Sequence, residues 1–389
     1  MRCRAILILL LILTGCATTR LQPVGKDVKF EEDEKRLWTR AEEEQDVLDN
    51  GGLLYKDQAL EAYINEVARK LQSKQVYSVI PFRVKVILNP YLNAFAYPNG
   101  AVYVHTGILA RMDNEAQLAT LLAHEMTHAT HRHGVSSFRS VKNKTAFLAS
   151  MQGTVGVVPV LGDLATQLGA IGTMASVSGH SRDQETESDI VGLRLMTNAG
   201  YDPREAPKLF IHLKNELAEE KMKEPFFFGT HPRIKERIEN YEGLLKTEYA
   251  GKKGALNRDI FIKKTQAMIL DNAQLDLKGG RFSVAQRGIE KYLSIKPNDA
   301  KAYYLLGETM RQRGEKGDLE KAKEYYQKAV ASNASYAASY KGMALVSMKK
   351  SERGQAKKYF ESYLSLSPNA SDRAYIEEYI KECGKGGKQ

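Results

Sequence analysis

The feature that most constrains this chain is a His-Glu-x-x-His pattern formed by His124, Glu125 and His128. It lies within residues 114–131, where apolar residues recur at helical spacing and predict a helix with one buried side. On a helix the two histidines are one turn apart on one face, so both imidazoles can bind one metal ion. Buried histidines and a buried glutamate are costly unless something satisfies them, and a metal does so. The alternative is a surface helix with incidental histidines.

This spacing predicts one zinc ion per chain, held in part by His124 and His128. Glu125 is offset by one residue and can reach water bound to the zinc instead of the zinc itself. Zinc lowers the pKa of such water toward about 7, so a carboxylate can take its proton at neutral pH. The pattern therefore predicts a hydrolase that cleaves peptide bonds without a covalent intermediate.

A catalytic zinc site needs a third protein ligand, and residues 181–199 offer one on a second predicted helix. Glu185 and Asp189 are four residues apart and share a face, whereas Glu187 points elsewhere. We assign Glu185 as the ligand and Asp189 as the hydrogen-bond acceptor that orients a ligand histidine. An acidic, solvent-facing stretch is the alternative for this segment.

Four further histidines are expected to lie outside the metal site. His131 is two helical turns beyond His124 and thus too far away, and His133 is also expected not to bind zinc. His105 and His212 are interpreted as structural histidines.

Upstream of this helix the sequence predicts a small β-sheet. Residues 82–88 alternate and are rich in β-branched side chains, which indicates a strand. Residues 93–96 and 101–105 flank a Pro-Asn-Gly turn and predict two further strands. Residues 134–180, rich in Gly, Ala, Val and Thr, are interpreted as a lid or apolar insertion over the site. A membrane-dipping segment is the alternative.

Residues 260–385 show a repeat of helix pairs. Alanines recur 37 and 34 residues apart, and a larger apolar residue follows each by four positions; the positions are Ala285, Ala322 and Ala356, with Ile289, Tyr326 and Phe360. This pattern resembles the tetratricopeptide repeat, a helical hairpin of about 34 residues. Residues 372–382 would form a capping helix. A generic helical bundle is the alternative.

The N-terminus has the features of an export signal. Arg2 and Arg4 precede a short apolar run that ends in Leu-Thr-Gly-Cys16, which resembles the bacterial lipobox. Residues 1–15 would be removed, Cys16 would be lipidated and residues 16–30 would form a tether. Ala17 favours the outer over the inner membrane by the rule for such lipoproteins. An ordinary cleaved signal peptide is the alternative.

The basic excess lies in the last third of the chain. From Gly251 onward there are 27 Lys and Arg against 16 Asp and Glu, while residues 1–250 are nearly neutral. This indicates an acidic partner or only solubility, because the charges are interspersed. Nucleic-acid binding is disfavoured, since no basic patch interleaved with aromatic residues is present. Three distant cysteines exclude a disulfide framework or a cysteine-type zinc site.

Together these motifs resemble the zinc metallopeptidase family of the CAAX prenyl protease, HtpX and BepA. The shared pieces are Asn93-Ala-Phe-Ala96, Pro98-Asn-Gly100, Thr106-Gly107, His124-Glu-Met-Thr-His128, Arg132-His133, Glu185-x-x-x-Asp189, Gly200-Tyr-Asp-Pro203 and Thr230-His-Pro232. Their order and the trailing repeats match the BepA-like branch. The resemblance implies an α+β, zincin-type (gluzincin) protease core at residues 31–250, mostly helical with a small sheet, followed by an all-α repeat solenoid.

The resemblance also implies roles for further residues. Glu185 would complete the zinc site, and His231 would act near the metal in a regulatory or catalytic role. Arg237 would anchor that segment or Asp189. The substrate would add as a strand along the sheet edge formed by Asn93, Ala94, Phe95 and Ala96.

The implied function is quality control of unfolded or misassembled envelope proteins by a periplasmic, lipid-anchored endopeptidase. Protein partners would dock on the repeats, with the outer-membrane assembly machinery among the candidates. The alternative is an envelope assembly or chaperone-like binding protein whose metal site is latent.

Overall fold

The computed structural model describes residues 21–25, 28–142, 180–219 and 234–385 of the 389-residue chain. Two compact units are present, Met1–Phe261 and Ile262–Gln389. None of the helices in these described ranges is both long enough and apolar enough to span a membrane.

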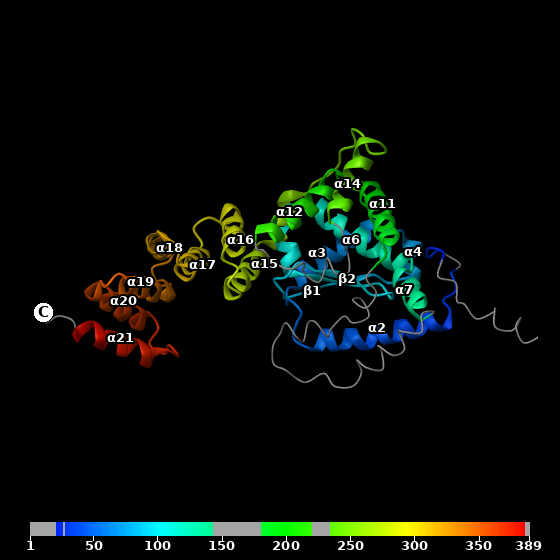
Figure 1. The fold of residues 1–389 in the computed structure, drawn as a ribbon. Coiled ribbons are helices and arrows are strands. Elements are labelled where there is room, and N and C mark those ends of the chain that lie inside the picture. Colours follow the sequence, from blue (N-terminus) through cyan, green and yellow to red (C-terminus); the bar gives the residue numbers. More distant parts are fainter. Residues whose placement is uncertain (1–20, 26–27, 143–179, 220–233, 386–389) are drawn as a thin grey trace, which may run out of the picture. The chain divides into compact units, whose positions relative to one another are not determined.

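The first unit is mainly helical and contains three short strands, which follow α4 and precede α5 in the sequence (Figure 1). Its elements are α2 (Glu32–Asn50), α3 (Gln58–Leu71), α4 (Lys74–Val79), β1 (Arg83–Ile87), β2 (Ala94–Ala96), β3 (Ala101–His105), α5 (Thr106–Arg111), α6 (Glu115–Thr130), α7 (His133–Lys142), α11 (Arg182–Asn198), α12 (Glu205–Glu219) and α14 (Ile234–Lys246).

The sheet has the order β1-β3-β2, so β3 is central. β1 pairs with β3 in parallel, with Arg83 opposite Ala101, while β2 pairs with β3 antiparallel, with Ala94 opposite Val104. The turn between β2 and β3 contains Gly100 at φ +88°, a conformation that glycine adopts without a Cβ clash. Because β3 is the central strand, β2 is an edge strand of the sheet within the described residues.

Helix α2 covers one face of the sheet, and α3 and α6 lie on the other side (Figure 1). Ala41 and Leu48 of α2 are fully buried in one cluster with Phe95, Tyr97 and Tyr103 of the sheet region. Burial of apolar surface contributes roughly 25 cal/mol per Å², so this contact stabilises the attachment of α2 to the sheet.

Helix α6, which carries the His-Glu-x-x-His pattern, differs from the prediction of one buried side. Every residue from Glu115 to Thr130 is buried. The helix packs against α3, α11, α12 and the sheet, so it is surrounded by other elements. Local periodicity suggested a two-sided helix, but its small and apolar residues lie all round it, which is typical of a central helix.

The second unit consists of successive helix pairs followed by a single last helix. Its elements are α15 (Arg258–Lys278), which begins before the boundary, α16 (Phe282–Ile295), α17 (Ala300–Arg313), α18 (Asp318–Ser332), α19 (Ala337–Lys349), α20 (Arg353–Leu366) and α21 (Arg373–Lys385). The predicted fold class, a mostly α protein with a small sheet and an all-α repeat region, is confirmed.

The repeated positions of the second unit form its core. Ala322 and Tyr326 of α18 are fully buried, and the Tyr326 ring packs against Gly307 of α17 and Gly342 of α19. The two glycines leave room for the ring, because a Cβ at either position would overlap it. In the last helix, Ile376 joins the apolar cluster of the preceding pair.

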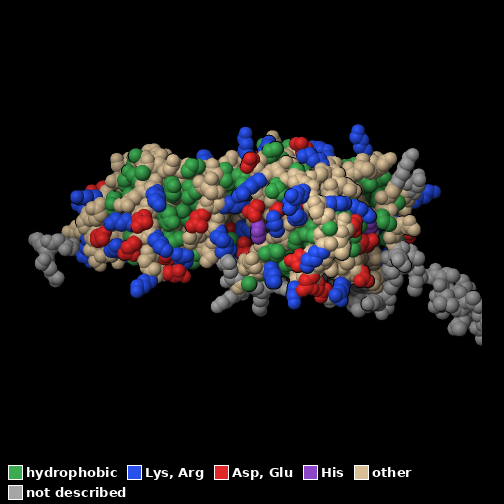
Figure 2. Space-filling view, turned by 90° about the horizontal axis from the view of Figure 1, so that it is seen from above, with side chains coloured by type: hydrophobic (Ala, Val, Ile, Leu, Met, Phe, Trp, Pro, Cys, Tyr) green, Lys and Arg blue, Asp and Glu red, His purple; other side chains and the backbone are tan. Residues whose placement is uncertain are grey.

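The charges of this unit are interspersed in the described part of its surface. On the face shown in Figure 2, Lys and Arg side chains alternate with Asp and Glu over the helix pairs at the left of the view. Ion pairs such as Lys341–Asp372 at 2.9 Å and Lys350–Glu320 at 3.0 Å link neighbouring helices. The basic excess is thus spread out on this face, which agrees with the solubility interpretation.

Candidate metal centre

Helix α6 places the two histidines of the pattern side by side. The Nε2 atoms of His124 and His128 are 3.0 Å apart, and both side chains are buried. Helix geometry explains this, because residues i and i+4 project from the same face one turn apart.

Helix α11 brings Glu185 to these two histidines. Its Oε2 lies 3.5 Å from Nε2 of His124, and its Oε1 lies 3.4 Å from Nε2 of His128. Ser181 caps the helix, since its hydroxyl accepts from the backbone N–H of Gln184 while the Gln184 side chain accepts from Ser181 N–H at 2.9 Å. The cap fixes the first turn, from which Glu185 projects.

The three side chains have the spacing of a metal site. A tetrahedral ion with ligand bonds of about 2.0–2.1 Å requires ligand atoms about 3.3–3.4 Å from one another. The observed separations among His124, His128 and Glu185 are 3.0, 3.4 and 3.5 Å. Three protein ligands of nitrogen and oxygen type leave a fourth position for water or substrate. The three residues therefore fit a divalent ion.

A glycine in α11 permits this approach. Gly192 faces the α6 backbone, where a Cβ would lie 3.1 Å from N of His124 and 3.3 Å from C of Ala123. Sequence reasoning did not single out Gly192. The sequence does point to Gly192, because a glycine inside a predicted helix costs stability and usually has a packing reason.

Asp189 and Arg237 support the first histidine. Oδ1 of Asp189 is 3.0 Å from Nδ1 of His124, while Nε and Nη2 of Arg237 donate to the Asp189 carboxylate at 3.0 and 2.6 Å. Tyr241 donates its hydroxyl to the same carboxylate at 2.7 Å. Nη1 of Arg237 is 3.3 Å from Oε2 of Glu185, so the guanidinium links both acids.

These contacts shift the titration of the buried groups. Burial raises the pKa of Asp189, but the charge of Arg237 and the hydrogen bond from His124 outweigh it, so that pKa is lowered. For His124, burial and Arg237 lower the pKa, yet Asp189 and Glu185 raise it to about 9. The acids thus favour a positive charge at this place, whether from a proton or from a metal ion.

Glu125 is buried on α6 between the two histidines. Within the described residues, its carboxylate is not one of the three groups whose ligand atoms converge. Glu125 follows His124 by one residue and precedes His128 by three, a position that is consistent with a role beside the metal.

The predicted substrate strand lies in β2, which packs against α6. Asn93, Ala94 and Phe95 are buried and Ala96 is half-buried. One edge of β2 is hydrogen-bonded to β3, and next to it the backbone N–H of His105 donates to the carbonyl of Asn93 at 3.0 Å. The strand is therefore present at a sheet edge, as expected.

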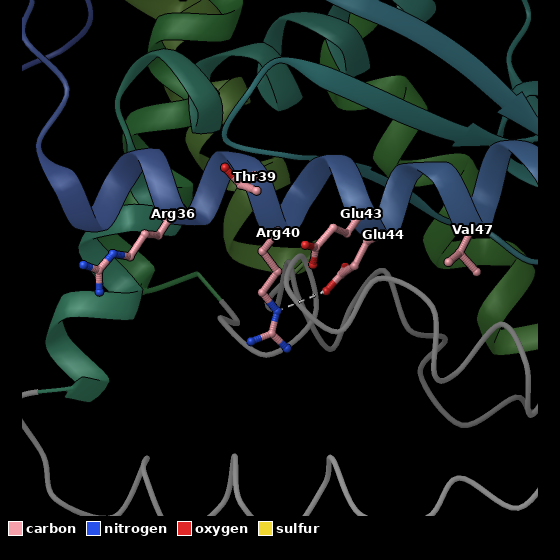
Figure 3. Close-up of a pocket in the computed structure, with 6 residues that line it drawn as sticks. All are labelled: Arg36, Thr39, Arg40, Glu43, Glu44 and Val47. Carbon is pink, nitrogen blue, oxygen red and sulfur yellow. Dashed lines mark ion pairs between the residues drawn. The ribbon is translucent and has the colours of Figure 1, made fainter.

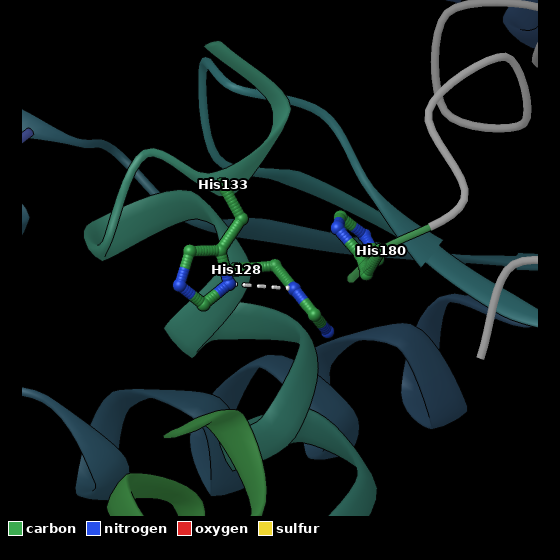
Figure 4. Close-up of side chains that lie close together, drawn as sticks. All are labelled: His128, His133 and His180. Atoms are coloured by element: carbon green, nitrogen blue, oxygen red, sulfur yellow. Dashed lines mark hydrogen bonds between the residues drawn. The ribbon is translucent and has the colours of Figure 1, made fainter. Parts of the chain in front are cut away.

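A second group of histidines surrounds His128, and the sequence did not predict it (Figure 4). Nδ1 of His133 lies 2.9 Å from Nδ1 of His128, and the His180 ring stacks on the His128 ring with centroids 3.6 Å apart. Glu187, predicted to point away from the metal, contacts Nε2 of His133 at 3.1 Å. Burial lowers the pKa of His133 to about 4, so this ring is neutral at pH 7.

Several predicted features lie outside the described residues. These are Cys16 and the signal segment, His231 with Pro232, and residues 143–179 of the predicted lid. The start of that segment is the helix α7. His105 is buried and His212 lies 3.6 Å from Asp113, and neither belongs to the metal centre.

The exposed side of α2 carries a separate hollow (Figure 3). Its described lining is Arg36, Thr39, Arg40, Glu43, Glu44 and Val47, and Arg40 pairs with Glu44 at 3.8 Å. This lining contains no histidine, so the hollow is distinct from the metal centre.

Comparison with known proteins finds relatives that match about half of this chain. The beta-barrel assembly-enhancing protease of Escherichia coli K12 is 28% identical over 195 residues, covering 48% of this chain and 39% of that protein. The mitochondrial metalloendopeptidase OMA1 of Schizosaccharomyces pombe is 34% identical over 182 residues, covering 46% and 51%. The chain thus spans about half or less of the length of these relatives.

A solved structure, the crystal structure of MamA, is similar at 20% identity, covering 38% of this chain and 85% of that one, with a TM-score of 0.26.

The family model for peptidase family M48 matches residues 55–245. That range contains His124, Glu125, His128, Glu185 and Asp189, as well as the strands beside them. Over residues 55–245, just under half of its length, the chain therefore matches peptidase family M48, a family of metallopeptidases.

Proposed function

We propose that this protein is a zinc-dependent endopeptidase that cleaves unfolded or misassembled proteins of the bacterial cell envelope. The observation that carries the proposal is the convergence of His124, His128 and Glu185 within 3.5 Å of one another in a buried site. Nitrogen and carboxylate ligands at this spacing suit zinc. Relatives that are named proteases support the hydrolytic role.

Bound zinc would polarise the scissile carbonyl and make water a better nucleophile at neutral pH. Glu125 takes the proton from the attacking water and delivers it to the nitrogen of the leaving amine. Asp189 holds the His124 ring through Nδ1, and Arg237 keeps that carboxylate ionised. His231 is proposed to contribute to the same reaction, on the family resemblance alone.

The substrate is proposed to bind as an extended strand along β2. Addition to a sheet edge uses main-chain hydrogen bonds and therefore selects unfolded segments more than particular sequences. The short strand of Ala94, Phe95 and Ala96 lies against the metal-binding helix, which supports this arrangement. Selection of extended chains suits a quality-control protease.

The proposed location is the periplasm, with a lipid anchor on Cys16 in the outer membrane. One acylated cysteine with its flanking tether suits a protein that works at the membrane surface. Incorporation of labelled fatty acid should be lost in Cys16→Ala, and equal labelling of both forms would exclude the anchor.

The proposed activity is tested with the full-length chain in detergent. Glu125→Gln should retain one zinc per chain and lose cleavage of an unfolded protein by about 10²–10⁴-fold. Glu43→Gln, an exposed carboxylate on α2, is the matched control and should cleave normally. Retained cleavage by Glu125→Gln would overturn the assigned role.

The alternative is a binding protein that uses the helical repeats while the metal site is latent. The helix pairs of the second unit support protein binding in general, because stacked pairs present extended surfaces. The same variant separates the two functions in cells. If Glu125→Gln fully restores envelope function to a deletion strain, the binding role is sufficient.

A further inference from the structure

The second metal-binding histidine has a polar contact on its far side that the reaction described above does not use. Nδ1 of His128 is 2.9 Å from Nδ1 of His133, and Nε2 of His133 is 3.1 Å from Oε2 of Glu187. His128 and His133 are buried, whereas the Glu187 side chain is 51% exposed. The three groups form a continuous hydrogen-bonded chain from the metal centre to solvent.

The backbone explains why His133 is in this place. Helix α6 ends at Thr130, and Arg132 has a left-handed backbone at φ +57°, which turns the chain into α7 beginning at His133. Nε of Arg132 donates to Oε1 of Glu34 at 2.7 Å and ties this turn to α2. Because the turn is anchored, the His133 ring is held against α6 instead of being free on a loop.

If His128 binds metal through Nε2, the protons of the hydrogen-bonded series His128–His133–Glu187 can be assigned in only one way. A neutral imidazole carries one N–H, so the proton of His128 must be on Nδ1. That N–H donates to Nδ1 of His133, which must then be the acceptor. The proton of His133 is consequently on Nε2 and donates to the Glu187 carboxylate.

We propose that His133 and Glu187 are positioning residues that hold His128 in the metal-binding tautomer and orientation. This inference rests on the proposed metal site and adds residues that act through His128. The two ligand histidines are then supported differently. His124 donates to the buried Asp189, which an arginine holds, while His128 donates to a neutral ring backed by a half-exposed carboxylate.

The three histidines in Figure 4 are better explained by these hydrogen bonds than by a second metal site. The rings of His128 and His180 are nearly parallel, at 18° and 3.6 Å. Lone pairs on ring nitrogens lie in the ring plane, so stacked rings direct them along parallel planes instead of toward one shared ion. His180 therefore covers the face of His128, and the hydroxyl of Ser188 lies at a longer 3.4 Å from both Nδ1 atoms.

The test compares zinc affinity, measured by competition with a chelator, in three variants of the full chain. His133→Phe keeps a ring but removes the acceptor and should weaken zinc binding about 10–100-fold. His133→Asn places a side-chain oxygen near the position of Nδ1 and should restore affinity to within a few fold of wild type. Glu187→Ala should weaken binding less than His133→Phe, because its carboxylate is half-exposed.

His212→Asn, a partly exposed histidine on α12, is the control and should bind zinc as wild type does. Folding of each variant is checked by thermal unfolding with chelator present. Equal zinc affinity of wild type and a folded His133→Phe would overturn the inference. So would an Asn variant no better than the Phe variant. Tight zinc binding without cleavage by wild type would instead refute the proposed function and leave this inference standing.

Discussion

Replacement of Gly192 by alanine is expected to loosen the metal centre without touching any metal ligand. Gly192 is in the interior of α11, and an added Cβ would lie 3.1 Å from N of His124 and 3.3 Å from its Cα. Both are backbone atoms of α6, which cannot rotate away as the end of a side chain can. The two helices must therefore move apart by a few tenths of an ångström.

Two opposing effects set the magnitude. Alanine is favoured over glycine in a helix interior by about 1 kcal/mol. Overpacking of a tight contact costs about 1–3 kcal/mol, so the free energy of unfolding should fall by up to about 2 kcal/mol. Glu185 is two turns from Gly192 on α11 and is 3.4–3.5 Å from the histidines, already at the upper end of the tetrahedral spacing. A further outward shift should weaken zinc binding by about 10-fold.

The assay pairs chelator competition for zinc affinity with thermal unfolding of the metal-free protein. Gly243→Ala is the matched control, because Gly243 lies within α14 with nothing within 4 Å of an added Cβ. It should stabilise the protein by about 0.5–1 kcal/mol and leave zinc affinity unchanged. If Gly192→Ala behaves like this control, close helix contact does not position the ligands and the reasoning is wrong.

Three further results are expected. Removal of metal by a chelator should lower the unfolding temperature, and added zinc should restore about 2.7 kcal/mol of stability at 100 times its dissociation constant; an unchanged temperature in both conditions would mean that the three ligands hold no ion. Asp189→Asn should cost about 3–5 kcal/mol in urea unfolding, because it leaves the buried guanidinium of Arg237 without its main counter-charge; a loss below about 1 kcal/mol contradicts the importance of that pair. Gly342→Ala should destabilise the second unit by about 1–3 kcal/mol through overlap with the Tyr326 ring, with zinc affinity unaffected; a circular-dichroism melt as stable as wild type would argue against that packing.

Local sequence was enough for the part of the site that depends on helical periodicity. The pairing of His124 with His128 and the offset of Glu125 follow from 3.6 residues per turn, and no tertiary contact is needed to derive them. The strands beside β3 and the repeated alanines of the second unit could also be predicted from the sequence, because alternation and fixed repeat length are local signals.

The packing of α6 could not be read in this way. Periodicity predicted one buried side, yet the helix is enclosed by three helices and the sheet. Which elements surround a helix depends on the path of the whole chain, and no window of neighbouring residues contains that information. The same holds for Gly192, whose value appears only when α11 lies against α6.

Local sequence patterns predict a helix with a pair of candidate metal-binding histidines, a candidate acidic ligand and a series of helical repeats. The packing of the folded chain is what brings Glu185 to both histidines, Arg237 to Asp189, and His133 to His128. These contacts join segments distant in sequence, and their energies depend on separations of a few ångströms and on exclusion of water. Such separations are properties of the packed chain, which local propensities do not specify.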